Sequence, residues 1–207
     1  GQVISVGKGI SPQSDIAVFN MLGYDFQGKK YAGRGIIEII GCGVDFCDGD
    51  LALRGNFATL DSNRIIDRRA GRDIVKEEAE SVCKFLVDHL QFEDPNVSVM
   101  VTPTISHRVI IKFRHTSIYL SDKITNTDPA YGKLNGIGIA KTDVESMFVQ
   151  ESQSEDNSES SILSAKIVNE FTGKSITLLR EHPVNLTRIS NNKKPMNVIL
   201  LRDAGNS

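Results

Sequence analysis

The sequence has few of the features that bind nucleic acids or cross membranes. It contains no tryptophan, aromatic residues make up 6%, and the net charge of -2 gives no basic field for a nucleic-acid backbone. No apolar run approaches the length needed to cross a bilayer, and the start at Gly1 lacks the charged and apolar regions of a secretory signal. We therefore expect a soluble, cytoplasmic protein without a nucleic-acid or membrane partner.

Cysteine is also scarce. Cys42, Cys47 and Cys83 are an odd number and form no CxxC pair, which argues against a disulfide framework or a structural zinc site. Reduced thiols in a cytosolic compartment fit this pattern. The length of 207 residues allows one sizeable core, or one domain with part of another.

The most informative stretch runs from residue 49 to residue 72. Two strands, over about residues 51–60 and 64–67, are predicted on either side of Asp61-Ser62-Asn63, because these residue types favour a tight reversal. Guanidinium groups present paired donors that fit carboxylate and phosphate oxygens. The stretch therefore predicts a pocket for a small dianion, with a solvated basic face as the alternative. Its five arginines are Arg54, Arg64, Arg68, Arg69 and Arg72.

Small residues stand beside these charges. Gly55, Ala70 and Gly71 are expected to clear space for close approach of a ligand to the backbone. Farther along, His107 and Arg108 precede a predicted strand, where the histidine is either a structural hydrogen-bonding residue or, with its basic neighbour, part of an anion site.

Apolar spacing predicts the remaining elements. Residues 75–90 and 162–182 have helical spacing, whereas residues 97–101, 109–113 and 197–202 read as strands. The polar and acidic run at 150–161 has no apolar content, so it is expected to be a disordered surface excursion.

Ser14 stands at the start of a predicted short helix that stops at Gly23. The usual role of a serine here is capping the helix. A nucleophile is the alternative, because a helix N-terminus stabilises an alkoxide or a phosphate ester.

Several stretches, taken together and in this order, resemble the archaeal-type, 2,3-bisphosphoglycerate-independent phosphoglycerate mutases of the alkaline phosphatase superfamily. The resemblance covers nearly the whole chain. Its pieces are Ser14 to Ala17, Leu22 to Asp25, Gly33 to Gly35 with Glu38, Gly49 to Arg54, Asn56 to Thr59, Asp67 to Arg72, His107-Arg108, Thr127 to Pro129, His182 to Asn185, and Leu200 to Arg202 with Ala204-Gly205.

The resemblance implies an α/β fold in which helices flank a mixed sheet. It divides the chain into residues 1–35, part of a phosphatase-like core with the nucleophile loop; residues 36–190, an inserted α+β substrate-binding domain; and residues 191–207, a return strand to that core. Family members are much longer than this chain, so these residues are expected to be a central fragment that is inactive alone.

The resemblance also assigns roles. Ser14 falls where the family has its catalytic nucleophile, which is also a metal ligand. The implied reaction interconverts 3-phosphoglycerate and 2-phosphoglycerate through a phosphoserine, with two divalent metals (Mn, Mg, Zn or Co) and no 2,3-bisphosphoglycerate. The residues that would bind phosphoglycerate are Arg54, Arg68, Arg69, Arg72, His107, Arg108 and Asp128.

Three positions depart from the family pattern. Val18 and Ala130 stand where the family usually has histidines, and Gln13 replaces a small or glycine-type neighbour of the nucleophile. Most of the metal ligands have no counterpart in the sequence, because no Asp, Glu and His spacing rebuilds a two-metal centre. The alternatives are a phosphotransferase of the same superfamily that uses another small acceptor such as homoserine, and a non-catalytic anion-binding module.

Overall fold

The computed structural model describes residues 41, 43–134, 137–140 and 148–206. The predicted elements before residue 41, including the helix that begins near Ser14, lie outside the described residues. The described elements are β1 (Leu51–Asp61), β2 (Arg64–Asp67), the short 3-10 turn η1 (Ala70–Arg72), α3 (Lys76–His89), β3 (Val97–Pro103), β4 (Arg108–His115), β5 (Tyr131–Leu134), β6 (Ile137–Ala140), α4 (Glu159–Arg180), α5 (Pro183–Ser190) and β7 (Val198–Asn206).

A five-stranded sheet organises these elements, and β1 is its central strand. β1 pairs antiparallel with β4 along Leu51–Asn56, with β7 along Leu51–Ala58, and with β2 near its end. β3 continues the sheet beyond β4, while β5 and β6 form a separate antiparallel pair. The α/β class is confirmed, and every described strand pair is antiparallel. The expected domain division stays a prediction, but β7 is a full member of the sheet of β1.

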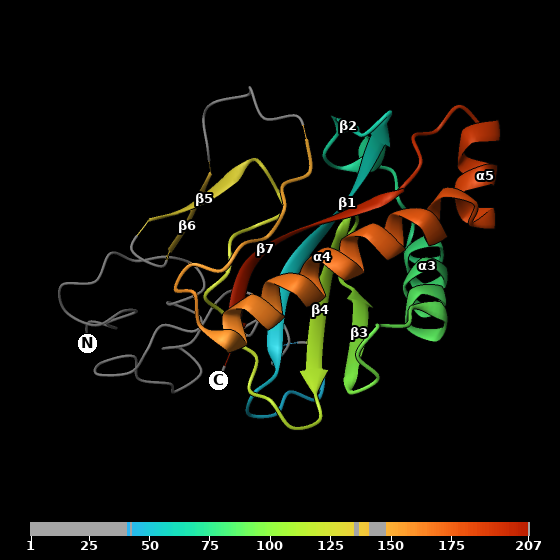
Figure 1. Ribbon diagram of the computed structural model, residues 1–207. Helices are drawn as coiled ribbons and strands as arrows, with labels where there is room; N and C mark the ends of the chain where they lie inside the picture. Colours follow the sequence, from blue (N-terminus) through green and yellow to red (C-terminus); the bar gives the residue numbers. More distant parts are fainter. Residues whose placement is uncertain (1–40, 42, 135–136, 141–147, 207) are drawn as a thin grey trace, which may run out of the picture.

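One face of the sheet is apolar because side chains alternate along each strand. Leu53 and Phe57 of β1, Ile111 of β4 and Leu201 of β7 are fully buried in the core on this face. The helices α3 and α4 pack against the sheet (Figure 1). Phe171 of α4 joins this core. The main stabilisation of the fold is burial of this apolar face, at about 25 cal/mol for each Å² removed from water.

The opposite face carries the intervening side chains, and these are more polar. Arg54 and Asn56 of β1, Arg108 and Lys112 of β4, and Arg202 of β7 occupy the alternate positions. This face is the one that the helix layer leaves free for a polar site.

The predicted hairpin is confirmed. β1 and β2 are joined at Ser62 and Asn63, which both have positive φ, 48° and 68°. Two consecutive left-handed residues are typical of a tight turn that matches the twist of antiparallel strands. The helix predicted at 75–90 is confirmed as α3, the long helix near 162–182 as α4, and the strands at 97–101, 109–113 and 197–202 as β3, β4 and β7.

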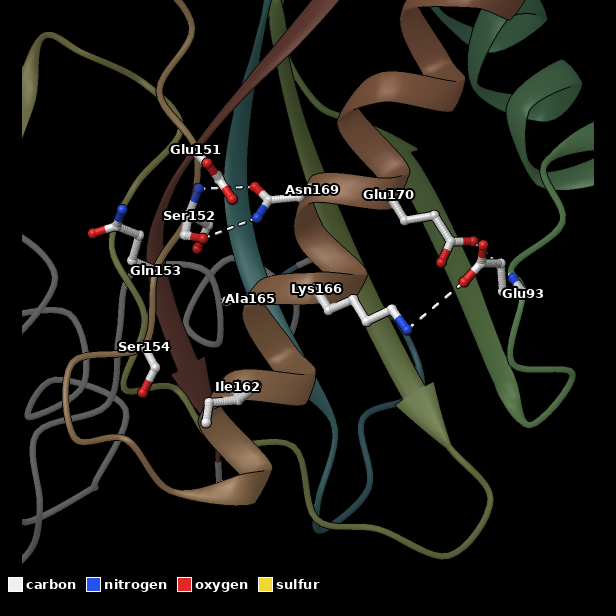
Figure 2. A pocket seen from close by; sticks show the side chains of 10 residues that line it. All are labelled: Glu93, Glu151, Ser152, Gln153, Ser154, Ile162, Ala165, Lys166, Asn169 and Glu170. Carbon is white, nitrogen blue, oxygen red and sulfur yellow. Dashed lines mark hydrogen bonds and ion pairs between the residues drawn. The ribbon is translucent and has the colours of Figure 1, made fainter.

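The expectation that residues 150–161 are disordered is wrong. The amide group of Asn169 in α4 accepts from Ser152 N at 2.8 Å and donates to Ser152 O at 2.9 Å, as a neighbouring strand would (Figure 2). Asp156 accepts from the hydroxyl of Ser161 at 2.6 Å, which lowers the pKa of Asp156 to about 2. The polar residues of this segment are thus held in place by hydrogen bonds to α4 and to its first turn. The amino-acid composition of the segment alone does not indicate these partners.

In the described part of the chain, every helix is too short or too polar to span a bilayer.

Candidate functional site

A polar hollow of about 300 Å³ lies on the polar face of the sheet. It collects side chains from β1, the loop after β2, the turn before β4, the start of β5, and β7. Segments far apart in the sequence therefore meet at one place. Its lining residues are Asn56, Arg68, Arg69, Arg72, Ser106, His107, Arg108, Tyr131 and Arg202.

Strand register places the most buried members. Asn56 of β1 is the Cα partner of Arg108 in β4, and Arg54 is the partner of Arg202 in β7. Asn56 and Arg202 are 5% and 4% exposed, so they form the floor of the hollow. Arg69, Arg72 and Arg108 are exposed and form its rim.

The loop from Asp67 to Asp73 positions two rim arginines. The carboxylate of Asp67 accepts from Arg69 N at 2.8 Å and from Gly71 N at 3.2 Å. Ala70, Gly71 and Arg72 all have positive φ, at 44°, 81° and 60°. A run of left-handed residues is costly outside glycine, so other contacts must hold this loop in place.

Arg188 of α5 supplies these contacts from beneath. It is 1% exposed and donates to the carbonyl of Ala70 at 3.1 Å and to both carboxylate oxygens of Glu78 at 2.9 and 3.2 Å. It also contacts Asp73 and donates to the carbonyl of Lys194 at 2.8 Å. The buried charge is thereby paired, which a buried guanidinium requires.

Asp128 holds another arginine of the hollow. It is 1% exposed, and Arg68 donates to its two oxygens at 2.7 and 2.6 Å. Arg202 lies 3.9 Å from the same carboxylate. The ring of Tyr131 lies 5.3 Å from the guanidinium carbon of Arg68 and 4.6 Å from that of Arg202. Both distances are within the range of a cation–π contact.

The lining has five guanidinium groups and no carboxylate, so its potential is positive. Burial lowers the pKa of His107, and the charges of Arg108, Arg202 and Arg72 lower it further. Burial, followed by the charge of Arg54, lowers the pKa of Arg202. Each shift has the sign expected of a group whose charged form is buried and lies among other cations.

Three buried polar atoms around the hollow have no hydrogen-bond partner in the described part of the chain. They are Oδ1 of Asn56, Nε of Arg68 and Nη1 of Arg202. Buried polar atoms are normally paired, so this concentration of unpaired atoms indicates a place where a ligand completes the set.

The structure brings together five of the residues that the sequence predicted for the site: Arg68, Arg69, Arg72, His107 and Arg108. Three others lie outside the lining. Arg64 is exposed on β2, Arg54 is buried, with Nη1 3.4 Å from Asp203, and Asp128 lies behind Arg68. Ser14, the predicted nucleophile and metal ligand, is outside the described residues.

The predicted role of Gly55 is wrong. A Cβ on Gly55 would lie 2.7 Å from Val109 Cγ2 and 2.8 Å from Ile199 Cγ2, so the missing side chain leaves room for the apolar core. The pleat of β1 turns this position away from the arginines. Gly71 does lie in the arginine loop, where its φ of 81° suits glycine.

The sequence reading missed Asn56, Tyr131, Arg202 and Arg188 as contributors to the site. One signal was available for Arg202. An arginine inside a strand that is otherwise apolar must be paired or must face a ligand.

A second hollow, of about 540 Å³, lies beside α4 (Figure 2). Glu93, Glu151 and Glu170 contribute three carboxylates to it, against the single ammonium of Lys166, which lies 3.7 Å from Glu93. Its charge is opposite to that of the arginine hollow, so it is a poor place for an anion.

The two divalent metals implied by the resemblance do not fit the described residues, among which no group of three or more His, Cys, Asp or Glu side chains could hold an ion. Both described cysteines, Cys47 and Cys83, are free thiols, and burial raises the pKa of Cys83 to about 12.

Comparison with known proteins identifies the family. The family model of the 2,3-bisphosphoglycerate-independent phosphoglycerate mutases matches residues 1–185. Mutases of this name from Aeropyrum pernix and Methanobrevibacter smithii are 42% and 36% identical to this chain over 99% of its length, which covers 48% and 46% of theirs.

A solved structure supports the same assignment. The cofactor-independent phosphoglycerate mutase from Thermoplasma acidophilum superimposes with a TM-score of 0.71 at 32% identity, over 95% of this chain and 47% of that one. The chain spans about half the length of the relatives it matches. The chain belongs to the 2,3-bisphosphoglycerate-independent phosphoglycerate mutase family.

Proposed function

We propose that the arginine hollow binds phosphoglycerate while the full-length protein interconverts its 3-phospho and 2-phospho forms. The observation that carries this proposal is the set of five guanidinium groups around one cavity with unpaired buried atoms at its floor. A carboxylate and a phosphate on one small molecule require such a set of donors, because both are acceptors with paired oxygens.

In the proposed reaction Ser14 is the nucleophile. Its oxygen takes the phosphoryl group from the ester oxygen of phosphoglycerate, and the serine proton passes to the departing glycerate oxygen. The neighbouring glycerate hydroxyl then attacks the phosphoserine, the bond between phosphorus and the serine oxygen breaks, and the proton of that hydroxyl returns to the serine oxygen. The charge of a phosphoryl group in transfer is spread over its oxygens, so cationic side chains lower the barrier. The metal ligands of this reaction are proposed to lie outside the described residues.

The glycerate formed between the two transfers must stay bound. We assign this retention to the hollow, because its rim arginines come from a loop and a hairpin turn and its floor comes from the sheet. Binding groups at several points around one cavity keep a bound reactant in position between successive steps. The protein is proposed to act in the cytoplasm, where its substrate would be a soluble metabolite.

The test compares two arginines in the full-length protein. Arg69 lines the hollow, whereas Arg64 is exposed on β2 and does not. Arg69→Ala is expected to raise KM for 3-phosphoglycerate about 10- to 100-fold, the effect of losing a charged hydrogen bond. Arg64→Ala is expected to leave KM unchanged. Equal effects of the two substitutions would show that the hollow does not bind substrate.

The same preparation tests the other readings. Phosphate transfer from ATP to homoserine without mutase activity would assign the protein to a phosphotransferase. Calorimetric binding of phosphoglycerate without any turnover would indicate an anion-binding module.

A further inference from the structure

Asn56 differs in chemistry from the charged groups around it. All charged side chains of the lining other than the titratable His107 are guanidinium groups, which only donate hydrogen bonds. Asn56 Oδ1 is an acceptor, and it is buried without a partner in the described part of the chain. Of the three unpaired buried atoms around the hollow, Asn56 Oδ1 is the acceptor, whereas Arg68 Nε and Arg202 Nη1 are donors.

An unpaired buried acceptor selects the group that pairs with it. Leaving such an atom unpaired costs free energy, so a ligand with a donor at this point gains affinity. Carboxylate and phosphate oxygens are acceptors and do not pair with Oδ1. An ammonium group would meet the five guanidiniums, which repel it. A neutral hydroxyl is the donor that fits.

The second unpaired floor atom lies within reach of the same ligand. Arg202 is two residues along β7 from Leu200, the Cα partner of Asn56. Diagonal neighbours of this kind are about 7–8 Å apart at their Cα atoms and lie on one face of the sheet. A molecule of three carbons could therefore offer an anionic oxygen to Arg202 Nη1 and a hydroxyl to Asn56 Oδ1.

We propose that Asn56 determines specificity by accepting a hydrogen bond from the free hydroxyl of the bound ligand, so that the hollow selects hydroxycarboxylates over anions without a hydroxyl. This inference rests on the proposed function and names what that site recognises. Each phosphoglycerate has one free hydroxyl, and the glycerate formed in between has two. Asn56 thus takes a different hydroxyl of the glycerate before and after reorientation.

A pair of ligands tests this role in the full-length protein. The first is 3-phosphoglycerate, and the second is 3-phosphooxypropanoate, in which hydrogen replaces the 2-hydroxyl. Calorimetry or competitive inhibition gives the ratio of their dissociation constants. The wild-type protein is expected to prefer the hydroxyl-bearing ligand by about 10-fold or more, the usual gain from satisfying a buried polar group.

Two substitutions at Asn56 separate recognition from folding. Asn56→Leu removes the acceptor at similar size, and it should bring the ratio close to 1 while it retains affinity for 3-phosphooxypropanoate. Asn56→Asp keeps an acceptor, so it should keep the preference while its charge weakens binding of both anions. Arg64→Ala, on β2 outside the hollow, is the control and should keep the wild-type ratio.

The outcomes are distinct. Equal binding of both ligands by the wild-type protein would overturn the role of Asn56 and leave the anion-binding role of the hollow standing. Equal weakening of both ligands by Asn56→Leu would also overturn it, because the amide would then face the ligand with its NH₂ group. Failure of both ligands to bind the wild-type protein would instead reject the proposed function.

Discussion

The guanidinium of Arg188 donates a hydrogen bond of 3.1 Å to the main-chain carbonyl of Ala70. This bond connects α5 to the loop that carries Arg69 and Arg72, although Arg188 does not itself line the hollow. The loop has positive φ at three consecutive residues, so it needs a partner that fixes its backbone. Arg188 is that partner.

Arg188→Met should therefore weaken both the fold and ligand binding. Loss of the buried guanidinium leaves Glu78 and Asp73 without their shared partner. We expect the free energy of unfolding to fall by about 2–4 kcal/mol. The fall is limited because both carboxylates are partly exposed to water, which solvates them in the variant. KM for 3-phosphoglycerate should rise while kcat changes less. Denaturant titration and steady-state kinetics measure the two effects.

Arg180→Met, at the exposed end of α4, is the control for Arg188→Met. The pKa of Asp73 gives a second readout. Its hydrogen bond from Arg188 holds this pKa below the usual value, so it should rise in the variant. An Arg188→Met protein with lower stability but unchanged KM would show that the loop holds its geometry without this contact.

Asp128 is expected to act as a counter-charge. The sequence predicted that it grips substrate, but it is buried behind Arg68 and lies 3.9 Å from Arg202. Asp128→Asn removes a negative charge from behind the hollow, so sulfate affinity should rise a few-fold by calorimetry. The free energy of unfolding should fall by about 1–3 kcal/mol, because a charge-assisted hydrogen-bond pair is lost.

The control for this substitution is Asp88→Asn, in an exposed pair with Lys84 on α3. It should change neither quantity by a measurable amount, since exposed pairs contribute little. A drop in phosphoglycerate affinity with unchanged sulfate affinity in Asp128→Asn would favour direct contact with substrate and contradict the counter-charge role.

His107 gives a pH dependence whose sign follows from its surroundings. Burial and three arginines lower its pKa below the usual value of about 6.5. The unfolded chain therefore binds this proton more readily, so the stabilising contribution of His107 is present above about pH 6.5 and is lost as pH falls through the folded pKa. The negative charge of a bound anion opposes the effect of the three arginines, so anion binding should raise the pKa of His107.

Anion binding should consequently become tighter as the pH falls through this range. Sulfate is the suitable probe because its charge is constant there, and NMR titration of the imidazole with and without sulfate reports the pKa directly. His107→Asn should remove most of the pH dependence of sulfate affinity. An imidazole pKa that sulfate leaves unchanged would place the ring outside the bound anion's field.

The sequence predicted features that depend on neighbouring residues. The turn at Asp61-Ser62-Asn63 and helix α3 follow from local turn chemistry and apolar spacing, and both are confirmed. Five of the predicted arginine and histidine side chains meet at one hollow because the turns that carry them are adjacent in the sheet.

What the sequence did not predict depends on long-range pairing. Arg202 reaches the floor only because β7 pairs with β1, and the register of that pairing is not encoded in either strand alone. The ordered conformation of residues 150–161 likewise depends on Asn169. Its side-chain amide hydrogen-bonds to the main-chain N–H and C=O of Ser152, as a neighbouring strand would. The composition of either segment by itself gives no indication of these partners.

Gly55→Ala and Gly173→Ala form a matched pair that tests which face of β1 is packed. A Cβ at Gly55 would lie 2.7 Å from Val109 and 2.8 Å from Ile199, in the core, whereas a Cβ at Gly173 in α4 meets nothing within 4 Å. Overpacking should lower the free energy of unfolding in Gly55→Ala by about 1–3 kcal/mol. Gly173→Ala should raise it by up to about 1 kcal/mol, because alanine favours a helix.

The functional effect of Gly55→Ala should follow from its place in β1. Relief of the clash requires the backbone of β1 to shift at Gly55, which lies between Arg54 and Asn56. This shift also displaces the floor of the hollow. KM for 3-phosphoglycerate should therefore rise as well. Gly173→Ala should leave KM unchanged. Had Gly55 cleared space for a ligand, as the sequence suggested, Gly55→Ala would raise KM while the urea midpoint stayed at the wild-type value. A rise in KM together with a lower urea midpoint would instead place the added methyl group in the core beneath the arginines.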